Sequence, residues 1–290
     1  MFLEEGGVRL LEERTCKLID NLPGAIAGEE EPVHQVRVAS RRLRVVLPIL
    51  APEPDGRKVK RLRRGLAEVV EVAGTGRDLD VSIRLFDENL LRDGEAAPEV
   101  KSLRRRLIAA RGRSRRQMNL RLRELKLGRM LKDLESLRRH GSEDLFVCMA
   151  RYRRARDKGA ARLLRAMGEV GDRFDPAALH GVRKAARRMR YLAEVGAAFH
   201  PDLEEVPRLF KKIQDELGRI QDAHVLAERM RQTAANAARV GQDQLAARAR
   251  AIASGFSDLS RGLHHGYLLM DPAEQVRRAL VLMAHQQSAA

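Results

Sequence analysis

The sequence predicts an all-α protein made of two pseudo-symmetric helical bundles, the product of an internal duplication, around a shared basic groove. Three observations predict it. Leucine, alanine, arginine and glutamate recur at helical spacing along nearly the whole chain, whereas the period-two runs typical of strands are missing. Glycine and proline gather in short stretches between the helical segments. A pattern of basic residues in the first half returns in the second half.

Three stretches rich in glycine, proline and acids delimit the helices of the first half. They are "LPGAIAGEEEP" (22–32), "PILAPEPDG" (48–56) and "AGTGRD" (73–78). We expect helices at 5–21, 33–50, 57–73, 79–92 and 97–139.

The second half is punctuated in the same way by "GDRFDP" (171–176), "HPDLEEVP" (200–207) and "LGRIQD" (217–222). We expect helices at 144–170, 177–199, 203–218, 222–239, 242–265 and 272–286. Two of these starts are well marked, because Asp175 and Asp271 each offer a capping carboxylate just before a proline at the first helical position.

The internal repeat joins an ordered set of residues in the two halves. His34, Val36, Arg37, Arg41, Arg42 and Arg44 reappear in the same order and spacing as His180, Val182, Arg183, Arg187, Arg188 and Arg190. Further along, Gly74 and Asp78 match Gly218 and Asp222 at nearly the same offset. A nearly constant offset indicates duplication of a helical unit. We therefore predict a first helical bundle at 1–141 and a second at 142–290.

The overall charge predicts a polyanionic partner. The chain carries 56 Lys and Arg against 40 Asp and Glu, a net charge of +16. Proteins that bind single-stranded nucleic acid commonly stack bases on aromatic rings, and this chain has no Trp, three Tyr and seven Phe. The composition therefore favours a polyanion without bases.

Several other classes of protein are disfavoured. The two cysteines, Cys16 and Cys148, fit no zinc or redox motif, and we expect neither a metal nor a cofactor. No apolar run approaches the roughly 20 residues that span a bilayer, and no signal peptide is visible. We expect a cytoplasmic protein without a membrane span.

The repeated segments place their cations on one helical face. At about 100° per residue, Arg37, Arg41 and Arg44 share the face of His34, opposite an apolar face. The second copy has a like stripe, which consists of His180, Arg183, Arg187 and Arg190. Neither stripe contains an acid, although neighbouring like charges on a helix repel one another. The repeated arrangement predicts that a bound anion completes it.

The paired histidine helices, with "RDLDV" at 77–81 and "IQDAHV" at 220–225, resemble the CHAD family, the conserved histidine α-helical domain. The resemblance covers nearly the whole chain. It implies two bundles around a basic groove, binding of inorganic polyphosphate or a similar polyanion, and residence at polyphosphate granules. The candidate polyphosphate-binding residues are His34, Arg37, Arg41, Arg42, Arg44, Arg77, His180, Arg183, Lys184, Arg187, Arg188 and Arg190, with Arg61, Arg64, Lys211 and Lys212 as further candidates. Gln221 stands in the second copy where the first has Arg77, so a role of Arg77 has no counterpart there.

Two alternatives stay open. The same charge suits a protein that binds nucleic acid. An enzyme that cleaves or transfers phosphate, with His34 or His180 as nucleophile, is the second alternative. No general base lies at a fixed local spacing from either histidine, so we expect no catalysis. We expect Asp78 and Asp80 to cap a helix and pair with arginines rather than hold a divalent metal.

Overall fold

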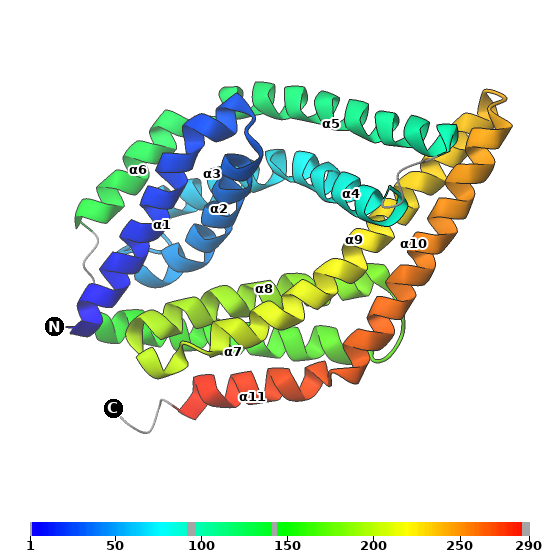
Figure 1. Ribbon diagram of the computed structural model, residues 1–290. Coiled ribbons are helices and arrows are strands. Elements are labelled where there is room, and N and C mark those ends of the chain that lie inside the picture. Colours follow the sequence, from blue (N-terminus) through cyan, green and yellow to red (C-terminus); the bar gives the residue numbers. More distant parts are fainter. Residues whose placement is uncertain (1, 92–96, 141–143, 286–290) are drawn as a thin grey trace.

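The computed structural model describes residues 2–91, 97–140 and 144–285, apart from the side chains of 2–5, 75–77, 138–140 and 285. In those residues it contains helices and no strand, which confirms the predicted all-α class (Figure 1). The helices are α1 (Phe2–Ala27), α2 (Glu30–Leu50), α3 (Arg57–Val72), α4 (Gly74–Leu90), α5 (Pro98–Glu124), α6 (Leu127–His140), α7 (Leu145–Val170), α8 (Pro176–Phe199), the 3-10 turn η1 (Pro201–Leu203), α9 (Val206–Arg239), α10 (Asp243–Leu269) and α11 (Pro272–His285).

The larger hydrophobic core joins α1, α2, α3, α7, α8 and the first half of α9. Leu18, Leu43, Leu66, Leu163 and Phe210 lie in it with almost no exposed surface. These residues come from both sides of the predicted boundary at 141. Burial of such side chains supplies most of the free energy of folding, because each contributes roughly 1.5–3 kcal/mol.

A second, smaller core forms where α4 and α5 meet α9 and α10. It contains Phe86 and Leu103 from the first half of the chain and Leu226 and Phe256 from the second. In Figure 1 this core lies at the end of the molecule where α9 and α10 form a long hairpin. Both cores therefore combine the two halves, and the division at 141–142 stays a prediction.

Two predicted helix boundaries are wrong. The segments 203–218 and 222–239 form the single helix α9, because Gly218 is buried and the contacts of its flanking residues Leu217 and Ile220 outweigh the roughly 1 kcal/mol that a glycine costs a helix. The single helix expected at 97–139 is divided instead. Leu125 has an extended backbone between α5 and α6, and it packs against the larger core.

Other boundaries shift by several residues. Helix α1 continues through Pro23 and ends at Ala27, just before Gly28, whose φ of 85° is in the left-handed region that glycine adopts without strain. Helix α4 begins at Gly74 rather than at 79. This earlier start brings the first turn of α4 next to α2, where it contributes to the site described below.

The two predicted capping carboxylates are confirmed. The carboxylate of Asp175 accepts hydrogen bonds from the backbone N–H groups of Ala177 and Ala178 at 2.9 and 3.0 Å. The carboxylate of Asp271 accepts one from the N–H of Glu274 at 3.0 Å. Asp175 therefore fixes the start of α8, the helix that carries the second basic stripe.

Replacing Asp175 should lower the stability of the protein. Asp175→Ala leaves two N–H groups at the start of α8 without their carboxylate, and we expect the free energy of unfolding to fall by about 1 kcal/mol. Denaturant unfolding followed by circular dichroism measures the change. Asp55→Ala is the control, since Asp55 is an exposed loop residue outside any helix. Equal effects of the two changes would contradict a capping role.

Candidate functional site

The two histidine helices α2 and α8 face each other through their basic stripes, and their opposite faces are buried as the sequence predicts. Val36 and Leu43 of α2 and Val182 and Met189 of α8 have almost no exposed surface. The hydrophobic cores on those faces hold the helices in place. The first arginines of both stripes are therefore held in one region between the helices.

The first arginine of each stripe lies beside the backbone of a glycine. Arg37 donates a hydrogen bond from Nη1 to the carbonyl oxygen of Gly74 at 3.2 Å. In the second copy, a Cβ atom placed on Gly218 would lie 3.0 Å from Nη2 of Arg183, closer than nearly all real contacts of that kind. An arginine thus lies near each of the two glycines matched in the sequence. A side chain at position 218 would crowd Arg183, whereas a Cβ atom at position 74 would lie 3.8 Å from Nη2 of Arg37, an ordinary contact.

Arg37, Arg41, Arg183 and Arg187 form a group that we call the central arginine cluster. Burial, followed by the charges of the other three arginines, lowers the pKa of Arg41 to about 9, and Tyr191 acts in the opposite direction. Burial and the charges of Arg183 and Arg37 also lower the pKa of Arg187. Such lowered values show that the fold holds these charges together at a cost in free energy.

One carboxylate reaches this cluster among the described ion pairs. Asp78 of α4 lies 3.6 Å from Nη1 of Arg37, and its side chain is 56% exposed. An exposed partner at that distance compensates little of the charge of four arginines. The neighbouring Asp80 is buried and pairs instead with Arg111 and Arg115 of α5. The predicted pairing of the two acids with arginines is confirmed, but the predicted helix cap is wrong, because both lie inside α4, which already begins at Gly74.

His180 lies at the edge of the central arginine cluster. Its Nδ1 atom is buried and has no hydrogen-bond partner. Burial, followed by the charges of Lys184, Arg183 and Arg187, lowers the pKa of His180 below its usual 6.5, and Asp78 acts in the opposite direction. The imidazole is therefore neutral at pH 7 in the absence of an anion. Its counterpart His34 is partly buried on α2.

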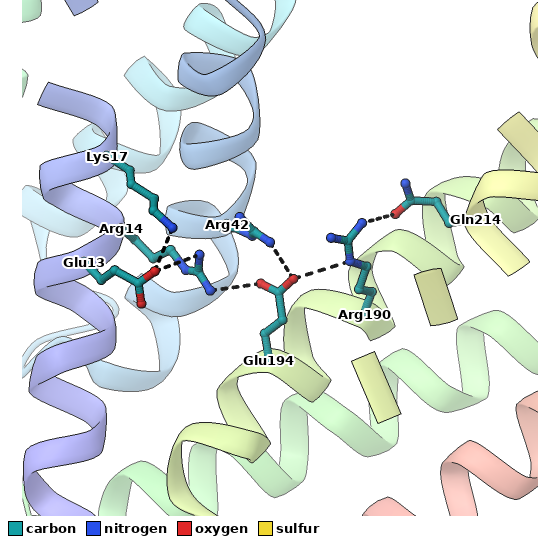
Figure 2. Close-up of polar contacts among 7 residues, drawn as sticks. All are labelled: Glu13, Arg14, Lys17, Arg42, Arg190, Glu194 and Gln214. Carbon is teal, nitrogen blue, oxygen red and sulfur yellow. Dashed lines mark hydrogen bonds and ion pairs between the residues drawn. The ribbon is translucent and has the colours of Figure 1, made fainter. Parts of the chain in front are cut away.

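Glu194 of α8 holds the far end of the two stripes together (Figure 2). One carboxylate oxygen accepts a hydrogen bond from Arg42 at 2.7 Å and lies 3.4 Å from Arg190, and the other accepts one from Arg14 at 3.3 Å. The guanidinium groups of Arg42 and Arg190 also lie 5.7 and 6.0 Å from the ring centre of Tyr191. This carboxylate therefore joins α1, α2 and α8.

The acid on the second stripe is a correction to the sequence prediction. The stripe was expected to contain no acid, but Glu194 lies one helical turn beyond Arg190 on the same face. Arg14 was also missed. Its place among buried residues of α1, one turn before Leu18, was the signal that could have found it, since an arginine at a core position needs a carboxylate.

The remaining candidates lie away from the central arginine cluster. Arg61 pairs with Asp133 of α6 at 2.7 Å, and with Arg64 it lines a cavity of about 400 Å³ between α3 and α6. Lys211 pairs with Asp215 on its own helix, and Lys212 is exposed. Arg44 and Arg188 form part of a second group with Arg63 and Arg162. Lys184 is exposed beside His180, and the side chain of Arg77 is outside the described residues.

Two further features bear on possible functions. Within the described residues, no group of three or more His, Cys, Asp or Glu side chains has an arrangement that could hold a metal ion. The described helices also include none long and apolar enough to cross a membrane.

The fold and this arginine-lined arrangement define a CHAD domain. The CHAD domain family matches residues 9–231, so the chain belongs to this family. Two Mycobacterium tuberculosis proteins, the uncharacterised Rv2226 and its equivalent MT2285 in a second strain, are each 32% identical over 229 residues. The match covers 75% of this chain but 43% of each relative, so the chain spans less than half of their length.

Two solved structures have the same fold. The crystal structure of the CHAD domain from the plant Ricinus communis is 24% identical, with a TM-score of 0.58 over 96% of this chain and 91% of that one. PptA from Streptomyces chartreusis is 17% identical, with a TM-score of 0.68 over 93% of this chain and all of that one. At these identities the likeness extends to the fold.

Loss of the Glu194 carboxylate should destabilise the protein. Glu194→Gln removes the carboxylate that pairs with Arg42 and leaves Arg14 with the half-exposed Glu13 at 3.7 Å, although the two arginine side chains are only 17% and 10% exposed. We expect the free energy of unfolding to fall by about 2–3 kcal/mol, as measured by denaturant titration.

A matched control is Glu228→Gln, which removes a carboxylate that pairs with Arg231 on the exposed surface of α9. The control should cost no more than about 0.5 kcal/mol, because exposed ion pairs one helical turn apart contribute little. Similar losses in the two variants would show that Glu194 does not hold the helices together.

Proposed function

We propose that this domain binds inorganic polyphosphate without catalysis, along the central arginine cluster between α2 and α8. One observation carries the proposal. Four arginines from the two helices lie together, and the carboxylate that the described ion pairs place beside them, Asp78, is exposed. A chain of phosphates supplies about one negative charge per unit and can receive several guanidinium groups in succession.

The absence of catalysis is part of the proposal. A histidine nucleophile needs a group that orients the imidazole and accepts its proton. The Nδ1 atom of His180 has no hydrogen-bond partner, and the neighbouring groups on its own helix are cations. We assign His180 a role as a hydrogen-bond donor to phosphate once the anion is present. Phosphate release in the presence of Mg²⁺ or Mn²⁺, lost in a His180→Asn variant, would contradict this assignment.

Nucleic acid is the weaker candidate for the polyanion. Three Tyr and seven Phe in 290 residues offer few rings for bases, and Tyr191, the aromatic residue beside the arginines, is buried beneath Arg42. Long-chain polyphosphate should therefore displace single-stranded DNA at equal phosphate concentration. DNA that displaced polyphosphate would favour the alternative. Association with polyphosphate granules follows from the proposal, and localisation of a tagged chain by microscopy tests it.

Charge reversal on the two stripes tests the binding site. Arg37→Glu combined with Arg183→Glu removes two phosphate contacts and places two carboxylates beside the polyanion. Each charge-assisted contact contributes about 1.5–3 kcal/mol, so we expect the affinity for polyphosphate to fall at least about a hundredfold in a calorimetric titration.

The control for this experiment is Arg116→Glu combined with Arg248→Glu, which changes the net charge equally at two exposed residues of α5 and α10. It should weaken binding slightly. If net charge alone attracts the polyanion, the two double variants will lose affinity equally, and the central arginine cluster is then not the site. Circular dichroism checks that both variants remain folded.

Binding should also depend on pH through His180. The surrounding cations lower the pKa of this imidazole in the free protein, and a bound polyanion raises it, because negative charge favours the protonated form. Binding therefore takes up a proton, and affinity should rise about fivefold as the pH falls from about 8 to about 5.5. His180→Gln should remove most of this dependence. An unchanged pH profile in that variant would show that His180 is not near the bound chain.

A further inference from the structure

A second group of arginines lies beside the site, and no carboxylate in the described part of the chain pairs with it. The charges that act on Arg188 of α8 come from Arg63 of α3, Arg162 of α7 and Arg44 of α2. Among the described residues, none of these four makes an ion pair or a side-chain hydrogen bond, and all four are exposed to solvent. We call them the flank arginines.

The internal repeat relates the flank arginines to the cluster around Glu194. Arg42 and Arg44 of α2 correspond to Arg188 and Arg190 of α8. On one side of the helix pair, Arg42 and Arg190 are held by Glu194. On the other side, Arg44 and Arg188 are the corresponding pair. Each side of the helix pair therefore combines one arginine from each helix. One of the two occupies the repeat position shared by Arg42 and Arg188, and the other occupies the position shared by Arg44 and Arg190.

The two sides of the helix pair differ in the residue at the repeat position that Glu194 occupies in α8. The same offset that relates Arg44 to Arg190 relates Pro48 to Glu194. Proline supplies no negative charge, and Arg63 and Arg162 add two further cations where Arg42 and Arg190 have a carboxylate. One side of the helix pair is therefore neutralised by Glu194, whereas the described residues place no paired carboxylate on the other.

A hollow lies along α7 and α8, and Arg162 is the flank arginine that lines it. Its volume is about 530 Å³, and its cationic lining consists of Lys158, Arg162 and Arg165 from one face of α7. Gly181 of α8 also lines it, two helical turns before Arg188 on the same face, and no atom lies within 4 Å of where a Cβ of Gly181 would be. Glu169 is the one acid in the lining. The hollow has the room and the charge for a row of phosphate groups.

We propose that the flank arginines and this hollow form a second binding site for condensed phosphate, in which a phosphate group takes the place that the Glu194 carboxylate has on the other side. The proposal rests on the proposed function, since it adds a second segment of the same kind of ligand. The exposed Lys184 of α8 lies on the helix surface between the central arginine cluster and Arg188. A long polyphosphate chain can therefore contact both sites in succession, and its affinity gains from the linkage.

Substitution at Pro48 tests this site. Pro48→Glu restores the missing carboxylate on the side of Arg44 and Arg188, so it should occupy the second site from within. Pro48→Gln is the matched control, because it makes the same change to the helix without the charge. Both replace a proline inside α2, and both should fold at least as well as the original chain.

Calorimetric titration with tripolyphosphate and with long-chain polyphosphate provides the measurement. We expect the original chain and Pro48→Gln to bind two tripolyphosphate ions, and Pro48→Glu to bind one. For long-chain polyphosphate we expect Pro48→Glu to lose about tenfold in affinity relative to Pro48→Gln. Arg162→Gln combined with Arg188→Gln should have the same effect without altering α2.

The outcomes separate this inference from the proposed function. If Pro48→Glu binds both phosphates as Pro48→Gln does, the second site does not exist, and the proposed function stands as long as the Arg37 and Arg183 charge reversals still abolish binding. If those reversals have no effect either, both proposals are wrong. If Pro48→Glu weakens the binding of DNA but not of polyphosphate, the second site recognises nucleic acid and the inference is wrong.

Discussion

The repulsion between two arginine-bearing helices is the constraint on which the rest of this structure depends. Helices α2 and α8 place Arg37, Arg41, Arg183 and Arg187 together, and burial, followed by the charges of the other three arginines, lowers the pKa of Arg41 to about 9. Two helices with such faces do not associate through those faces. They are held in place by their opposite, apolar faces, where Leu43 and Met189 are fully buried. The cores stabilise the fold, and the site uses part of that stability.

Three kinds of contact offset part of the repulsion among these arginines. Glu194 neutralises the far end by holding Arg14, Arg42 and Arg190. Tyr191 lies beneath two guanidinium groups and interacts with them through its ring. The backbone carbonyl of Gly74 accepts a hydrogen bond from Arg37 and so adds a neutral dipole near the charge. None of these removes the charge at the centre. That charge is therefore available to a ligand whose binding relieves the repulsion and stabilises the folded state.

The fold class and the stripe residues could be predicted from the sequence because they depend on local periodicity. The apolar faces of α2 and α8 and the cap at Asp175 follow from spacing alone. The divided helix at Leu125 and the continuous helix through Gly218 could not be predicted in this way. In both cases tertiary packing determines the local structure. Leu125 packs against the larger core, and the side chain of Arg183 lies against Gly218.

The sequence predicts which basic residues belong to the site, but not which of them lie together in the structure. A helical wheel places Arg44 near Arg41, yet the structure groups Arg44 with Arg188, Arg63 and Arg162. The wheel describes one helix, whereas the grouping depends on how two helices cross and which other helices flank them. The arginines of α3 and α7 carry no periodic signal that links them to the histidine helices. Arg14 was missed for the same reason, since its partner Glu194 is 180 residues away.

Departures from the repeat are more informative about function than the repeat itself. Residues that are the same in both copies, such as the glycines that receive Arg37 and Arg183, serve the shared packing of the two helices. Glu194 and Pro48 occupy matching positions but have opposite consequences for charge. A carboxylate on both sides would neutralise both arginine pairs and favour stability alone. A carboxylate on neither side would leave both arginine pairs without a neutralising partner and lower the free energy of unfolding. With one internal carboxylate and one side without it, Glu194 supports the fold, and the other side stays open to the anion of the proposed second site.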